Sequence, residues 1–178
     1  LKVKDAIGRE RQTSTIQFDF NLPERCNLEY VGQDGMKHQP FLVHRALLGS
    51  LERFFGILVE HYAGAFPTWL APEQVRVLSI SEKHAEYARE VGAALRAAGI
   101  RCTVDVSGDP IGAKVKSSGL IRIPYVLVVG DMEAENKTVA VSVRDRSKGG
   151  GKYYTKDVTL PVDDFIKRIQ QEIDDKVS

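Results

Sequence analysis

Residues 124–129 read Pro-Tyr-Val-Leu-Val-Val, and Gly-Asp follows directly. A continuous apolar run of this length predicts a strand buried on both faces. Upstream, strand patterns over residues 74–80 and 101–106 alternate with helical patterns over residues 83–98 and 110–120. This alternation predicts a compact α/β domain with a mixed sheet flanked by helices. A further strand over residues 137–144 and a final helix over residues 162–176 would complete it.

The first part of the chain has a different pattern. Short runs with period-two alternation cover residues 15–20, 28–31 and 40–44, and turn signals at residues 21–23 and 32–35 separate them. Strands this close together, without helices between them, predict an antiparallel sheet.

The periodicity then becomes helical over residues 49–62, with Ser50 as a plausible N-cap and with Gly64 and Pro67 ending the helix. Ala71-Pro72 has the composition of a linker. We therefore expect two domains, residues 1–72 and residues 73–178.

The composition is that of a globular protein without a membrane segment. Hydrophobic residues make up 43%, yet no apolar run approaches the roughly 20 residues needed to span a bilayer. Cys26 and Cys102 form no CxxC spacing. The chain shows no N-terminal signal pattern, because residues 1–5 already alternate like a strand. A cytoplasmic location is the simplest expectation. The first residue is Leu1 rather than Met, which suggests a fragment or a processed chain.

The charge is unevenly distributed although the net charge is +1. Residues 101–156 carry ten Lys/Arg and six Asp/Glu, whereas residues 157–178 carry three and six. The positive block is either a solvated surface or a patch that faces phosphates, and the pattern alone leaves both open.

Residues 40–56 place a strand directly before a helix, with Gly49 and Ser50 at the junction and Arg53 in the first turn. A glycine permits close approach to the backbone, and a helix N-terminus and an arginine both favour anions. A nucleotide would suit this corner. From the spacing alone, however, an ordinary strand–helix corner with Arg53 on a solvated helix face is the favoured interpretation.

The sequence of this strand–helix corner resembles a known family. Gly-Ser-Leu-Glu-Arg at residues 49–53 is similar to motif 3 of class II aminoacyl-tRNA synthetases. The stretches at residues 44–54 and 66–72 resemble the threonyl-tRNA synthetase family in particular, and residues 8–20 agree with it. Arg11 stands where that family usually has an aromatic residue. The resemblance implies that residues 1–72 are an antiparallel-sheet fragment of a class II catalytic core.

Roles in the reaction follow from the resemblance. Arg53 would contact ATP, which is used with Mg²⁺, and Arg53 and Gln17 are the implied catalytic residues. His44 would be one of three ligands of a zinc ion that binds L-threonine. The implied ATP and substrate contacts are Gln12, Thr15, Gln17, Gly49, Ser50 and Arg53. Without the resemblance, a lone histidine and an alternating polar strand would more often be structural.

The family's other two zinc ligands, its motifs 1 and 2 and the dimer interface would lie upstream of Leu1. Cys26 does not match the family's ligand cysteine. We therefore expect this chain alone to bind zinc weakly and not to activate threonine. The full-length protein would be a homodimer.

The second domain resembles the anticodon-binding domain of class II synthetases at residues 99–101, 111–116 and 123–133. By resemblance, Lys116 and Arg122 would hold the anticodon loop of threonine tRNA, and Glu133 would read a base. The family often has an arginine where this chain has Ser142, so base reading at that point either shifts to Arg144, two residues further on and on the same face, or is lost. The basic stretch 148–152 receives no role beyond proximity to RNA.

Two functions remain open, with a weaker third. The chain is either part of a threonine–tRNA ligase or a catalytically inactive fragment or paralogue that only binds the anticodon. An α/β interaction domain without an RNA ligand is the third possibility.

Overall fold

The computed structural model describes residues 1–145 and 153–177 and divides into two compact units, residues 1–63 and 64–178. The basic stretch 148–152 lies outside the described residues. The predicted class is confirmed, because small antiparallel sheets are followed by a mixed α/β sheet. The units divide after Ala63, whereas the sequence pattern favoured a boundary after Pro72.

The first unit contains three two-stranded antiparallel ribbons, β1–β2, β3–β6 and β4–β5. Its elements are β1 (Lys2–Lys4), β2 (Glu10–Gln12), β3 (Thr15–Asp19), α1 (Asn21–Arg25), β4 (Tyr30–Val31), β5 (Lys37–His38), β6 (Leu42–Ala46) and α2 (Leu51–Tyr62). None of the residues of α2 is buried. This unit therefore has little hydrophobic core of its own.

Two local predictions in this unit have different outcomes. Ser50 is the N-cap of α2, as predicted, and its hydroxyl accepts a hydrogen bond from the Arg53 N–H at 3.2 Å. The turn predicted at residues 21–23 is wrong, because α1 forms there. The Asp19 carboxylate accepts the N–H groups of Asn21 and Leu22, which would otherwise lack a partner at the helix start.

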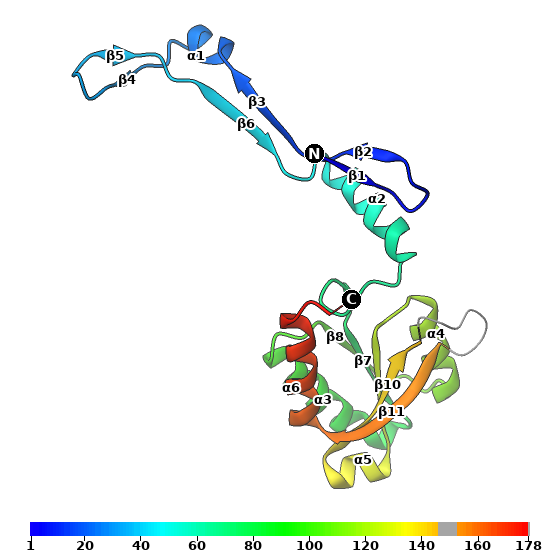
Figure 1. Ribbon diagram of the computed structural model, residues 1–178. Coiled ribbons are helices and arrows are strands. Elements are labelled where there is room, and N and C mark those ends of the chain that lie inside the picture. Colours follow the sequence, from blue (N-terminus) through cyan, green and yellow to red (C-terminus); the bar gives the residue numbers. More distant parts are fainter. Residues whose placement is uncertain (146–152, 178) are drawn as a thin grey trace. The chain divides into compact units, whose positions relative to one another are not determined.

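The second unit is a five-stranded sheet in the order β11-β10-β9-β7-β8 (Figure 1). Strands β7, β8 and β9 are parallel, and β10 and β11 are antiparallel. Its elements are β7 (Val75–Ser79), η1 (Glu82–His84), α3 (Ala85–Ala97), β8 (Cys102–Asp105), α4 (Ile111–Leu120), β9 (Tyr125–Val129), α5 (Asp131–Asn136), β10 (Thr138–Arg144), β11 (Tyr154–Pro161) and α6 (Val162–Asp174).

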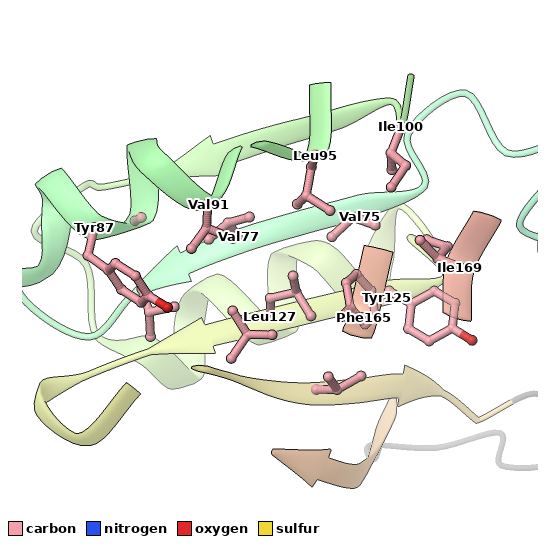
Figure 2. Packing of buried hydrophobic residues seen from close by; sticks show 14 residues of the cluster. Val75, Val77, Tyr87, Val91, Leu95, Ile100, Tyr125, Leu127, Phe165 and Ile169 are labelled. Carbon is pink, nitrogen blue, oxygen red and sulfur yellow. The ribbon is translucent and has the colours of Figure 1, made fainter. Parts of the chain in front are cut away.

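The main core lies between one face of this sheet and helices α3 and α6. Figure 2 shows Val91 and Leu95 of α3 and Phe165 of α6 against Val77 of β7 and Leu127 of β9. Alternate strand residues such as Leu78 and Val126 are also fully buried but do not belong to this cluster. They point to the opposite face, on which α4 lies.

The segment before β7, which includes the predicted linker, packs onto the second unit. The Arg101 guanidinium donates to the carbonyl oxygens of Trp69 and Ala71 at 2.9 Å. The Thr68 hydroxyl donates to the Glu172 carboxylate at 2.5 Å. These contacts explain why residues 64–72 cluster with the second unit rather than with the first.

In residues 1–145 and 153–177, no helix is both long and apolar enough to cross a membrane.

Candidate functional site

The β3–β6 ribbon presents one polar and one apolar face. Gln17 pairs directly opposite His44, so the two side chains share a face, and Thr15 and Asp19 alternate onto that face. The other face carries Ile16, Phe18 and Val43, which are 67%, 64% and 54% exposed. The structure therefore brings the predicted Thr15, Gln17 and His44 together on one side of the ribbon.

His44 is oriented by a carboxylate. Its Nε2 lies 3.0 Å from Oδ2 of Asp19. The Leu22 N–H and then the His44 ring hold the pKa of Asp19 below its ordinary value. Metal-ligating histidines usually have such a carboxylate on the second ring nitrogen. However, no group of three His, Cys, Asp or Glu side chains within the described ranges could hold a metal ion. The described residues thus do not form a three-ligand zinc site among themselves.

The polar face borders an open hollow of about 660 Å³. Its lining residues are Gln17, Phe18, Asp19, Phe20, Asn21 and His44. The predicted Gln12 is not among them, because it ends β2 and pairs with Lys2 in a different ribbon.

Gly49 is required at the strand–helix corner. Its φ is +72°, and an added Cβ would lie 2.9 Å from the Thr13 carbonyl oxygen. The backbone that approaches Gly49 is thus the chain's own. Arg53 is exposed in the first turn of α2, on the same turn that Ser50 caps. The predicted ATP contacts Gly49, Ser50 and Arg53 therefore form a second group, at the start of α2.

In the second unit, Lys116 lies on α4 and is exposed, as a phosphate contact requires. Lys114, two residues earlier, is only 2% exposed. Its ammonium group donates to the carbonyl oxygen of Ser79 at 3.0 Å. The Asp105 carboxylate lies 3.7 Å away. Burial tends to raise the pKa of Asp105, but the Ser107 hydrogen bonds and then the Lys114 charge lower it overall.

Arg122 and Arg144 lie together at the amino end of β9. Arg122 follows α4 with a left-handed φ of +62°, and its carbonyl oxygen accepts a hydrogen bond from the Arg144 guanidinium. The same guanidinium donates to the carbonyl oxygens of Phe66 at 2.7 Å and Ala65 at 3.2 Å. Arg144 therefore joins the connecting segment to the sheet, whereas the Arg122 side chain is exposed.

Glu133 lies beyond the carboxyl end of β9, in the first turn of α5. One carboxylate oxygen accepts the Gly130 N–H at 3.0 Å and caps the helix. Because β9 has five residues, its first and last Cα atoms are roughly 13 Å apart. Glu133 is thus not clustered with Arg122 and Arg144. The predicted RNA contacts therefore lie apart: Lys116 is on α4, Arg122 and Arg144 are near the amino end of β9, and Glu133 is beyond its carboxyl end.

A second polar group lies beside Glu133. His84 is buried, and its ring contacts the Ser81 hydroxyl at 3.1 Å and the Asp131 carboxylate at 2.9 Å. The His84 hydrogen bond lowers the pKa of Asp131. This contact ties the start of α5 to the segment that follows β7.

Sequence reasoning missed Lys114 and Asp19, although signals for both exist. Residues two apart on a helix lie about 200° apart around its axis, so exposed Lys116 implies an inward Lys114. Asp19 is two residues after Gln17 on a period-two strand and therefore shares its face.

Family models cover most of the chain. A model described as anticodon binding domain matches residues 74–172. The chain belongs to the anticodon-binding domain family. The matched residues fall within the second unit, which contains Lys116, Arg122 and Glu133. A second model, described as tRNA synthetase class II core domain (G, H, P, S and T), matches residues 1–62.

Among curated relatives, the chain is similar to threonine–tRNA ligases. It is 53% identical over 99% of its length to the enzyme of Acidobacterium capsulatum, and 47% identical over 99% to that of Aquifex aeolicus. These matches cover 25% and 26% of the relatives, so the chain spans about a quarter of their length.

Two solved structures are also similar. The RNA binding domain of threonyl-tRNA synthetase from Cryptosporidium parvum is 38% identical, with a TM-score of 0.79 over 96% of this chain and 41% of that one. The putative threonyl-tRNA synthetase ThrRS-1 from Aeropyrum pernix is 26% identical, with a TM-score of 0.64 over 98% of this chain and 40% of that one. The anticodon-binding domain thus occurs here in a chain whose relatives are threonyl-tRNA synthetases.

Proposed function

We propose that this chain is part of a threonine–tRNA ligase, in which its anticodon-binding domain binds the anticodon loop of threonine tRNA. The observation that carries the proposal is the 53% identity to a threonine–tRNA ligase over 99% of this chain. The full-length protein would join L-threonine to threonine tRNA through a threonyl-adenylate, in the cytoplasm and as a homodimer.

The first unit would contribute one wall of the active site. Arg53 would orient ATP, which enters with Mg²⁺, while Gly49 and Ser50 border it at the helix start. Gln17 and Thr15 would contact the substrate from the polar face of the β3–β6 ribbon. The opposite face, with Ile16 and Phe18, would pack against the remainder of a class II core, because such apolar side chains are rarely left together in water.

His44 would contribute one ligand to a zinc ion, with Asp19 fixing the ring. When bound, the zinc would anchor the amino and hydroxyl groups of threonine. Residues from elsewhere in the full-length protein would have to supply the other ligands.

In the anticodon-binding domain, Lys116 and Arg122 would contact backbone phosphates, and the second carboxylate oxygen of Glu133 would accept a hydrogen bond from a base. Arg144 was a candidate replacement for a base-reading arginine. Its hydrogen bonds to main-chain carbonyls favour a supporting role for it instead.

A catalytically inactive tRNA-binding module is the alternative, and a threonine-dependent pyrophosphate exchange assay separates the two. We expect the full-length protein to catalyse exchange, Arg53→Ala to lose it while retaining tRNA binding, and the 178-residue chain alone to be inactive. An inactive full-length protein that still binds threonine tRNA would support the alternative. Substantial exchange by the isolated chain would contradict the view that its active site is incomplete.

A further inference from the structure

Lys114 is a buried cation to which the proposed function gives no role. The residue is 2% exposed, and its ammonium group reaches the carboxyl ends of the neighbouring parallel strands β7 and β8. It donates to the Ser79 carbonyl oxygen at 3.0 Å and to the Asp105 carbonyl oxygen at 3.5 Å. The Asp105 carboxylate lies 3.7 Å from it.

Such burial is costly, since an ammonium group loses its water and regains only the acceptors that the fold provides. A methionine would fill the same space without that cost. The position of Lys114 therefore suggests a role for its hydrogen bonds beyond filling volume.

The rest of the inward surface of α4 is weakly apolar. Its other buried residues are Ser118 and Gly119. The Ser118 hydroxyl donates back to the Lys114 carbonyl oxygen at 2.8 Å. Ile111 and Val115 are only partly buried. Because small and polar residues bury little apolar area, the hydrophobic effect alone only weakly fixes the rotation of α4 about its axis.

Lys116 follows Lys114 by two residues and so projects from nearly the opposite side of the helix. It is exposed, on the side away from the sheet. Any rotation of α4 that withdraws Lys114 from the strand ends would carry Lys116 with it.

We propose that Lys114 is a positioning residue for RNA binding: by anchoring α4 to the carboxyl ends of β7 and β8, it holds Lys116 where an RNA phosphate can meet it. This inference rests on the proposed function, since it needs an RNA ligand.

The test is a double-mutant cycle on the 178-residue chain, with threonine tRNA transcript as the probe and dissociation constants measured at several salt concentrations. Lys116→Ala should weaken binding and lower the salt slope by about 1, because one phosphate contact is lost. Lys114→Met should weaken binding by about the same factor. The double variant should bind no more weakly than either single variant.

A purely structural Lys114 would lower the melting temperature and leave tRNA affinity below that temperature unchanged, which would overturn the inference. Losses that multiply in the double variant would also overturn it, since Lys114 would then act independently of Lys116. If wild type does not bind threonine tRNA at all, the proposed function fails, and the inference fails with it.

Asp105→Asn keeps the test decisive if Lys114→Met does not fold. It removes the carboxylate charge beside the ammonium group and retains the two carbonyl acceptors. The inference is supported if Asp105→Asn weakens tRNA binding when Lys116 is present but has no further effect in the Lys116→Ala variant. An unchanged affinity in both backgrounds contradicts it.

Discussion

The guanidinium group of Arg144 donates a 2.7 Å hydrogen bond to the carbonyl oxygen of Phe66, which lies 78 residues earlier in the chain. Arg144 ends β10, and Phe66 belongs to the segment before β7. With its contacts to Ala65 and Arg122, this arginine joins three stretches of main chain. A residue expected to read a base thus has a structural use.

Replacing Arg144 should therefore affect stability more than RNA binding. Arg144→Gln leaves carbonyl oxygens without their donor, which costs about 1–3 kcal/mol in the free energy of unfolding. Chemical denaturation measures that loss. Arg89→Gln, on the exposed side of α3, is the matched control and should change it by less than about 0.5 kcal/mol. Unchanged stability together with a smaller salt slope for tRNA binding would instead make Arg144 an RNA contact.

The hairpin of β1 and β2 should respond to acid. Burial tends to raise the pKa of Asp5, but the hydrogen bonds from Arg9 and Arg11 outweigh it and lower the pKa to about 2. A carboxyl whose folded pKa is depressed contributes stability above its unfolded pKa of about 4 and loses it as the pH falls through the folded value. The hairpin should thus weaken between about pH 4 and pH 2.

An NMR titration of the Arg9 amide follows this directly, since that N–H donates to Asp5 at 2.8 Å. Asp5→Asn should abolish the acid transition. A midpoint near pH 4 in the wild-type chain would show that the arginines do not hold this carboxylate.

Two glycines of α4 should respond oppositely to alanine. A methyl group at Gly119 would overlap the Tyr153 ring, whereas at Gly112 it would meet nothing within 4 Å. Gly112→Ala should raise the unfolding free energy by about 0.5–1 kcal/mol, because alanine favours helix. Gly119→Ala should lower it by about 1–3 kcal/mol through overpacking. Thermal or chemical denaturation of the two variants measures these changes. If Gly112→Ala and Gly119→Ala changed stability equally, the Tyr153 ring would not pack against Gly119.

The buried strands were predictable because each is a largely apolar run of residues in the sequence. The apolar runs in the sequence predict β7 and β9. The change of pattern along the chain also predicts that antiparallel strands in the first part are followed by an α/β domain. Strand β11 has no such signal, since none of its residues is buried. The six-residue helix α5 was also missed, because it is too short to show a period.

The site was only partly predictable, for a different reason. The register between β3 and β6 places Gln17 opposite His44, and this pairing cannot be predicted from the local sequence of either strand. The structural role of Arg144 and the packing of residues 64–72 onto the second unit both depend on long-range hydrogen bonds to main-chain carbonyl oxygens. Such acceptors cannot be located from the spacing of side chains in the sequence. The distinction between buried Lys114 and exposed Lys116 was accessible from helical geometry alone.

We propose that the anticodon-binding domain reads the anticodon of threonine tRNA, and filter binding with two transcripts can test this. The transcripts are threonine tRNA and a copy whose anticodon is exchanged. Glu133→Gln is the test variant, and Glu135→Gln, exposed on the same helix, is its control.

We predict that wild type and Glu135→Gln prefer the matched transcript by roughly tenfold, about 1.4 kcal/mol. Glu133→Gln should lose most of that preference while keeping the salt slope, because its phosphate contacts remain. Equal affinity of the wild-type chain for both transcripts would contradict the claim.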